Sequence, residues 1–295
     1  MNEPEHNCLN CGVALHGEYC SSCGQRDKNF HVPLKELAHE FGEEIFSFDE
    51  RLLRSLTPFL LKPGFLTLEY LSGKRKRYIS PFKLYFFLSF LFFFTSTLND
   101  TNKKNISDKN IIATDSLKPS IGTDSIFASI KEEKSGLRFT VADSAKAEKV
   151  FGRSFINGLE KMKSNPQPFF DKIREHRPKV IFILLPVFAL LLKLMYVRSK
   201  IFYSQHIVFA FYFHAFIFFI LLITDLLELT GWSFLQSYAD VLVLAIPINL
   251  YLGLKQVYRQ SRGKTLTKFL LLVASYGIVF LVVILLATLT LILFL

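Results

Sequence analysis

An apolar run at residues 269–295 contains no charged side chain. A helix needs about 20 residues to cross a hydrocarbon core of about 30 Å, and this run is longer than that. It therefore predicts a membrane-spanning helix that tilts in the bilayer or protrudes from it. The bilayer is the expected solvent for much of the chain.

Four other runs have the length and the apolarity of membrane spans. The composition agrees, because hydrophobic residues make up 51% of the chain and 32 of its residues are Phe, whereas soluble domains have about 45 to 50% on a count that includes Gly. We predict an all-α integral membrane protein with about five transmembrane helices. The predicted spans are 80–98, 178–196, 205–229, 234–254 and 269–295.

Basic residues at the ends of these runs predict the orientation of the spans. Lys and Arg gather before the first span, between the second and third, and between the fourth and fifth, while the turn at 229–234 contains neither. Because Lys and Arg favour the cytoplasmic side, the pattern predicts a cytoplasmic N-terminus and an extracytoplasmic C-terminus. The basic group at 172–179 dissents, but it follows a loop long enough to be exempt from this rule. We expect a multi-pass protein of the bacterial inner membrane.

Two matching cysteine hooks lie near the N-terminus, in a segment too short to build a hydrophobic core. Two Cys-x-x-Cys hooks can place four thiolates around one Zn²⁺, and a glycine after each hook supplies the tight turn. Four sulfurs leave no position for water, so the zinc is predicted to be structural. A redox pair would need one hook only, and a reducing compartment disfavours two disulfides. The predicted ligands are Cys8, Cys11, Cys20 and Cys23.

The segment between the hooks and the first span predicts amphipathic interfacial helices. Apolar residues recur at helical spacing after Pro33, and Ser47-x-x-Glu50 is a capping box before a second apolar stretch that Pro63-Gly64 ends. A basic collar then abuts the first span, where each cation near anionic lipid contributes about 1 kcal/mol. The collar is predicted to contact anionic headgroups, and a solvated run of charges is the alternative. It consists of Lys74, Arg75, Lys76 and Arg77.

Several short motifs in the first third of the chain form a recognisable set. They are Cys23-Gly24-Gln25, Pro63-Gly64, Tyr70-Leu71-x-Gly73-x-Arg75-x-x-Tyr78-x-x-Pro81 and the Phe-rich run at 89–94. Together they resemble a bacterial membrane family called domain of unknown function 3667. Further on, His206-x-x-Phe209 and Tyr251-x-x-Leu254-x-x-Val257-Tyr258 are similar as well. The resemblance implies a zinc ribbon followed by transmembrane helices, and it implies no catalytic residues.

The chain divides into five parts on this interpretation. Residues 1–27 form the zinc ribbon, 28–79 the interfacial helices with the basic collar, and 80–98 the first span. Residues 99–177 are predicted to be a partly disordered extracytoplasmic loop with one amphipathic helical pattern at 151–162. Residues 178–295 contain the remaining spans.

Two polar residues inside the predicted spans are candidate functional groups, because polar side chains at membrane depth are costly. His214 is the deepest ionisable residue, and a hydrogen bond between packed helices is favoured for it over proton transfer. Asn249, beside Pro247, lies where a helix can bend and expose backbone carbonyls.

No motif in the sequence indicates a reaction. The leading hypothesis is a non-enzymatic adaptor or accessory subunit that contacts a protein partner and anionic lipid headgroups through its ribbon and collar. Nucleic acid is not expected as a partner, because few basic residues lie between the hooks. The net charge of the chain is +10, but its basic residues lie beside the apolar runs. The alternatives are a small-molecule transporter or channel, and a lipid-modifying enzyme using Asp225, Glu228 and Asp240. The sequence leaves the oligomeric state open.

Overall fold

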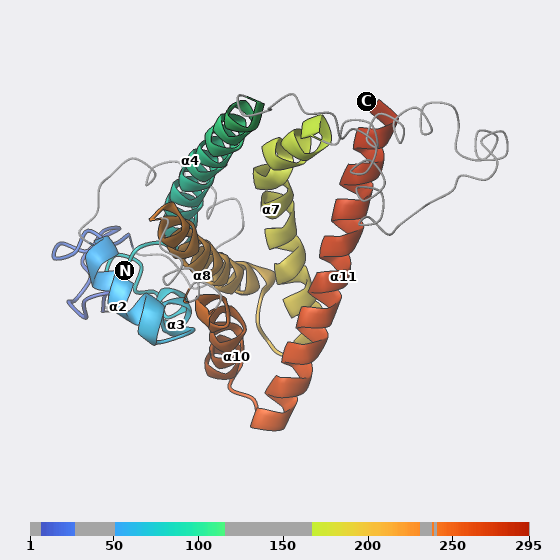
Figure 1. Cartoon of the computed structure of the whole chain (residues 1–295). Helices are drawn as coiled ribbons and strands as arrows, with labels where there is room; N and C mark the ends of the chain where they lie inside the picture. Colours follow the sequence, from blue (N-terminus) through green and yellow to red (C-terminus); the bar gives the residue numbers. More distant parts are fainter. Residues whose placement is uncertain (1–6, 27–50, 116–166, 231–237, 239–240, 295) are drawn as a thin grey trace, which may run out of the picture. The chain divides into compact units, whose positions relative to one another are not determined.

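The computed structural model describes residues 7–26, 51–115, 167–230, 238 and 241–294 (Figure 1). Within these ranges the fold is helical, and the only β-type pairings are two isolated bridges in the ribbon. The prediction of an all-α membrane protein is confirmed. The helices are α2 (Arg51–Leu61), α3 (Phe65–Leu71), α4 (Pro81–Asp115), α7 (Gln167–Met195), α8 (Tyr203–Leu229), α10 (Ala245–Tyr258) and α11 (Arg262–Phe294).

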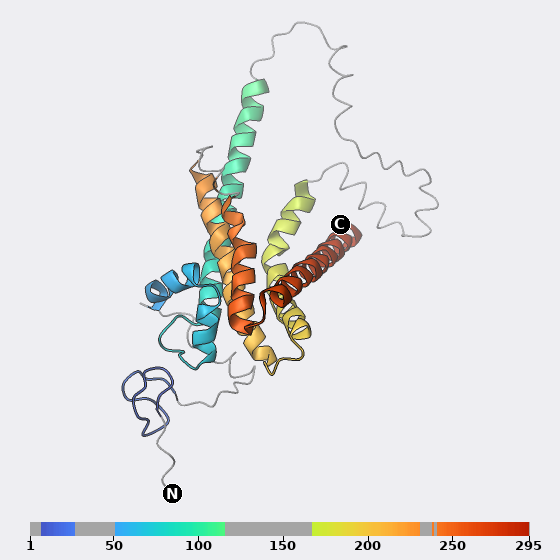
Figure 2. The same cartoon turned by 90° about the horizontal axis from the view of Figure 1, so that it is seen from below.

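The chain forms two compact units, and the helix core lies in the first of them, which comprises Met1–Asn99 and Lys179–Phe280. Helix α8 is the centre of this core, with 72% of its apolar span buried by other parts of the protein. A helix that is hydrophobic on all sides can be buried on all sides, and α8 has this composition. Figure 2 shows α4, α8 and α10 running alongside one another.

Aromatic side chains from several helices pack on α8. Tyr85 of α4 packs edge-on against Phe211, and Phe188 of α7 stacks on Phe213, with ring centroids 5.2 and 5.4 Å apart. Such pairs contribute about 0.5–1.5 kcal/mol beyond the area they bury. The Phe-rich composition therefore serves packing around one central helix.

Four helices in the described ranges are long and apolar enough to cross a membrane: Pro81–Asn99, Tyr203–Leu229, Val241–Tyr258 and Arg262–Thr290. They correspond to four of the five predicted spans. The predicted span at 178–196 falls in α7, where the described apolar part is the shorter segment Ile181–Met195. At 1.5 Å per residue this segment covers about 22 Å, and it begins where the described side chains of α7 begin.

The helix boundaries differ from the prediction on both sides of the predicted loop. Helix α4 continues past residue 98 to Asp115, and α7 already begins at Gln167. Polar residues are no obstacle to a helix that has already been nucleated, since each further residue adds one hydrogen bond. The predicted helical patterns at 34–45 and 151–162, and the capping box at 47–50, lie outside the described residues.

Local sequence explains where two of the spans begin. Pro81 is the first residue of α4, where its missing N–H is not needed, and the N–H of Lys83 donates to the Ser80 hydroxyl. At the start of α8, the N–H of Phe202 donates to Oε1 of Gln205, at 3.2 Å. Both bonds satisfy backbone groups that a helix end leaves without partners.

Helices α2 and α3 form a short hairpin, the α2–α3 hairpin, which packs on α8 and α10. Its turn contains Gly64, which adopts the left-handed conformation with φ 80°. A Cβ at this position would lie 3.1 Å from the carbonyl oxygen of Gly253 in α10. The turn thus brings two backbones together, and only glycine fits there without displacing one of them.

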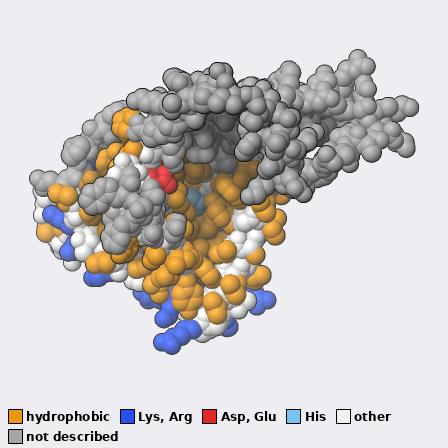
Figure 3. All heavy atoms as spheres, viewed as in Figure 1, with side chains coloured by type: hydrophobic (Ala, Val, Ile, Leu, Met, Phe, Trp, Pro, Cys, Tyr) orange, Lys and Arg blue, Asp and Glu red, His pale blue; other side chains and the backbone are white. Residues whose placement is uncertain are grey.

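Figure 3 shows one face of the molecule, which is mainly hydrophobic over the described atoms, with Lys and Arg at its lower edge. That edge is the α10–α11 turn, where Arg259, Arg262 and Lys264 are exposed. An apolar surface bordered by cations is the distribution expected of a membrane protein.

Candidate metal centre

The two cysteine hooks fold into two matching turns. In the first, the N–H of Gly12 donates to the carbonyl of Cys8, and the N–H of Cys8 donates to the carbonyl of Val13, both at 2.8 Å. In the second, Gly24 and Cys20 repeat this pattern, with bonds of 2.9 and 2.8 Å. Gly12 and Gly24 have φ values of 83° and 67°, which explains the glycine after each hook.

The four cysteine sulfurs converge, and all of them lie within 4.8 Å of one another. The Cys8 and Cys23 sulfurs are 3.6 Å apart, and the Cys11 and Cys20 sulfurs are 3.5 Å apart. Tetrahedral zinc with Zn–S bonds of about 2.3 Å requires sulfurs about 3.8 Å apart, so the cage fits this ion. These separations are much longer than the disulfide bond of about 2.05 Å.

The protonation of the four thiols favours a bound cation. Backbone N–H groups of Cys23 and Ser22 donate to the Cys20 sulfur and lower its pKa to about 6. At Cys11, a backbone hydrogen bond with Val13 lowers the pKa of the thiol. Burial and hydrogen bonds with the other three sulfurs raise the pKa, and the net result is a pKa of about 11. One thiolate thus forms readily, whereas four thiolates this close together need a cation to hold them.

The ribbon is attached to the segment that carries the basic collar. The Gln25 side chain donates from Nε2 to the carbonyl of Gly73, at 2.8 Å, and its Oε1 accepts from the N–H of Arg75, at 3.3 Å. Gly73 is buried with φ 90°, and a Cβ there would lie 2.7 Å from Cδ1 of Leu9. Gln25 also accepts, through its own carbonyl, the N–H of Cys20. One residue therefore links the second hook to the collar segment.

The four collar cations are partly held by protein groups. Lys74 pairs with both carboxylate oxygens of Glu69 at 2.9 Å, and the guanidinium of Arg75 lies 5.5 Å from the Tyr70 ring centroid. Arg77 is exposed, while Lys76 is half-buried. Lipid contact by the collar stays a prediction, and its most accessible charge is Arg77.

His214 connects two helices of the core. Its Nδ1 lies 2.8 Å from the carbonyl of Ala210, which can only accept, so Nδ1 carries the proton. Its Nε2 then accepts a hydrogen bond from the hydroxyl of Tyr276 in α11, at 2.9 Å. Both ring nitrogens of this buried side chain have partners, as a packing role requires.

We expect His214→Ala to have a modest effect. Interhelical hydrogen bonds in membranes contribute about 0.6 kcal/mol on average, and the truncated ring adds a small cavity. The unfolding free energy in detergent should fall by about 1–2 kcal/mol, with zinc content unchanged. Tyr276→Phe is the matched control, because it removes only the hydroxyl and should lower the unfolding free energy by less. If the His214→Ala variant folds normally but loses the function of the protein in cells, this result would favour the transport alternative over the adaptor hypothesis.

A second polar cluster joins the ends of four helices, α7, α8, α10 and α11, and no spacing in the sequence predicts that its residues meet. His206, fully buried, lies with Nδ1 2.6 Å from the Tyr258 hydroxyl, and the Tyr258 ring stacks on Tyr196 at 3.7 Å. The ammonium of Lys268 lies 3.8 Å from the Tyr196 ring centroid. Histidine and tyrosine are common in helix cores, so only the three-dimensional arrangement identifies the cluster.

The family comparison matches the part of the chain that carries the hairpin and the collar. Residues 49–93 match the family model DUF3667. Its description is "Protein of unknown function (DUF3667)", and the match confirms the resemblance found in the sequence. The DUF3667 region covers α2, α3, the basic collar and the beginning of α4. No curated protein and no solved structure matches the chain.

Proposed function

We propose that this protein is a non-enzymatic membrane adaptor whose zinc ribbon presents a binding surface to a protein partner close to the bilayer. The proposal places the ribbon and collar on the cytoplasmic side of a bacterial inner membrane, with the C-terminus outside. The gathering of Lys and Arg around the α10–α11 turn supports this orientation (Figure 3). Zinc has a structural part in this function and no part in a reaction.

The observation that carries the proposal is the attachment of the ribbon by Gln25. Two hydrogen bonds from the Gln25 side chain to the backbone of Gly73 and Arg75 hold the ribbon against the collar segment. A binding surface held in one position loses less entropy when a partner binds. An attached ribbon therefore suits recruitment of a partner to a defined place on the membrane domain.

The side of the ribbon that the collar segment does not cover offers contacts for such a partner. Tyr19 is 58% exposed, and Val13 is exposed beside the first hook. Arg26 donates from Nε to Glu18 and lies 5.9 Å from the Tyr19 ring centroid. An aromatic side chain next to an Arg is the composition of many interface centres, so a protein partner is favoured.

Site-specific cross-linking in native membranes tests the proposal. A photoreactive phenylalanine analogue replaces Tyr19 in the full chain, and mass spectrometry identifies the adducts. We expect one main protein adduct, and at least five-fold less of it in Gln25→Ala, because two bonds of about 1 kcal/mol each are lost. Gln256→Ala, the same change at an exposed position of α10, should leave the yield unchanged. A yield independent of Gln25, or adducts with lipid alone, would contradict the adaptor hypothesis.

A further inference from the structure

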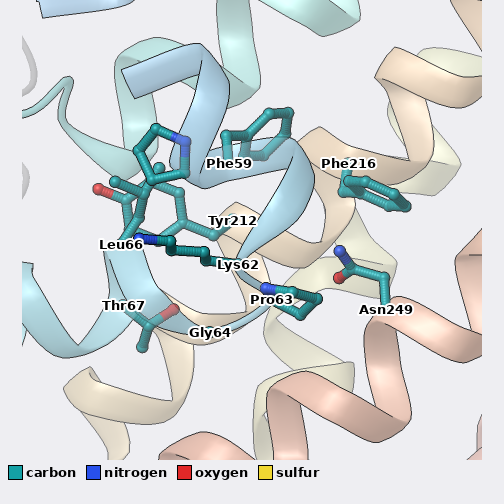
Figure 4. Close-up of a pocket in the computed structure, with 10 residues that line it drawn as sticks. Phe59, Lys62, Pro63, Gly64, Leu66, Thr67, Tyr212, Phe216 and Asn249 are labelled. Carbon is teal, nitrogen blue, oxygen red and sulfur yellow. The ribbon is translucent and has the colours of Figure 1, made fainter. Parts of the chain in front are cut away.

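A small, open pocket lies where the α2–α3 hairpin packs on α8 and α10 (Figure 4). Figure 4 shows Asn249 entering it from α10, and Lys62 and Pro63 from the hairpin turn. Two of the contributing helices, α8 and α10, belong to the segments that can cross a membrane. The pocket is small and open to the outside, so it can take one small polar group and excludes a whole lipid.

The walls of this pocket are fixed by close packing. Phe59 of α2 packs edge-on against Phe216 and Phe219 of α8, with centroids 5.8 and 6.2 Å apart. Gly64 lies against Gly253, and a Cβ at Gly253 would in turn lie 3.1 Å from the Phe209 ring. The hairpin turn therefore cannot move toward α10 to close the space.

Hydrogen bonds fix the remaining wall. The Tyr212 hydroxyl donates to the carbonyl of Ile79, at 2.8 Å, and the N–H of Ile79 donates to the Ser55 hydroxyl, at 2.9 Å. This chain connects α8, the segment before α4, and α2. The pocket is thus preorganised by the protein itself, which lowers the entropic cost of binding a ligand.

The polar side chains in the pocket attract an anion. Its lining includes the ammonium of Lys62, the hydroxyl of Thr67 and the amide of Asn249, and no Asp or Glu. The Lys62 ammonium lies 5.6 Å from the Phe65 ring centroid, and no acidic group in the described ranges pairs with it. Asn249 likewise has no side-chain hydrogen bond to any described residue, although it lies in a candidate span.

An unpaired amide in a membrane helix is costly, and such residues usually face a ligand path or another polar group. We propose that this pocket binds the phosphate group of an anionic membrane lipid. Lys62 pairs with the phosphate charge, and Thr67 and Asn249 donate hydrogen bonds to its oxygens. The acyl chains lie along the apolar surface of α10, where Ile248 and Leu252 are exposed next to Asn249. This site is separate from the basic collar and independent of the adaptor hypothesis.

Native mass spectrometry of the full-length protein tests this site, with phosphatidylglycerol added to delipidated protein in detergent. We expect one phosphatidylglycerol per chain to bind more tightly than the rest, and Lys62→Gln to raise its Kd about ten-fold or more, since a charged hydrogen bond is lost. Asn249→Leu should raise the Kd several-fold, and Lys62→Arg should restore most of the affinity. Lys264→Gln, which removes an exposed cation on α11, is the matched control and should change little.

Two further arms identify the source of the phosphate. Zwitterionic phosphatidylcholine should bind more weakly than phosphatidylglycerol, because its own cation opposes Lys62. Inorganic phosphate should compete only at far higher concentration than the lipid, because it lacks acyl chains for α10. Equal competition by inorganic phosphate would overturn the lipid assignment, and a Kd unaffected by Lys62→Gln, or equally raised by Lys264→Gln, would overturn the site. Unchanged melting temperatures exclude misfolding of the variants.

Discussion

Replacing Cys11 with serine is expected to remove the metal from the ribbon and to unfold residues 7–26. Zinc contributes about 10–16 kcal/mol to the folding of small four-ligand domains, and so short a segment has no other core. We expect elemental analysis to find one zinc per chain in the wild type and less than about one tenth of that in Cys11→Ser. The membrane helices should stay folded, because their core around α8 is a hydrophobic cluster separate from that of the ribbon.

The matched control is Ser21→Ala, which changes an exposed residue inside the second hook and removes no ligand. Limited proteolysis supplies a second readout, since loss of the hook geometry also removes the support for Gln25. Cleavage in the ribbon should become faster in Cys11→Ser and not in the control. Fresh, reduced wild-type protein without metal would show that the four sulfurs are not a zinc site.

The second large effect is expected at the turn of the α2–α3 hairpin. In Gly64→Val, a β-branched residue is forced to φ 80°, and its Cβ lies 3.0 Å from Cγ2 of Val257 as well as close to the Gly253 carbonyl. The left-handed conformation costs about 1–2 kcal/mol, and overpacking adds about 1–3 kcal/mol. We expect the unfolding free energy in detergent to fall by about 2–5 kcal/mol.

Gly277→Val is the control for this substitution, because a Cβ at Gly277 meets nothing within 4 Å and the residue lies in the apolar helix α11. Its unfolding free energy should change by less than about 1 kcal/mol, since valine is tolerated on an apolar helix surface. Equal stability of Gly64→Val and the wild type would show that the hairpin turn does not pack closely against α10.

The sequence predicts the parts of this fold that local spacing determines. Four apolar runs identify four span helices, and the two Cys-x-x-Cys hooks with their glycines identify the sulfur cage. Both signals come from residues that are close in the chain, so no knowledge of the tertiary fold is needed. The predicted span at 178–196 lies on helix α7, and the described apolar part of that helix is Ile181–Met195.

The contacts between distant segments could not be predicted in this way. Gln25 reaches Gly73, and Tyr212 reaches Ile79, across long separations that no periodicity encodes. The amphipathic pattern before the first span locates α2, yet it cannot distinguish an apolar face that meets lipid from one that packs on α8. The pocket around Asn249 lies between the α2–α3 hairpin, α8 and α10, which are far apart in the chain. Nothing in the sequence therefore predicts that Lys62 and Thr67 belong to it.

The central position of α8 has a consequence for how the protein is made. Helices α2, α3 and α4 precede α8 in the chain, and roughly 90 residues separate the end of α4 from the start of α8. At about 5–20 residues per second, α4 waits on the order of ten seconds after synthesis before α8 leaves the ribosome. During that interval Tyr85, which is fully buried in the finished protein, has none of its α8 neighbours. The early helices therefore enter the bilayer incompletely packed, and the emergence of α8 completes their assembly.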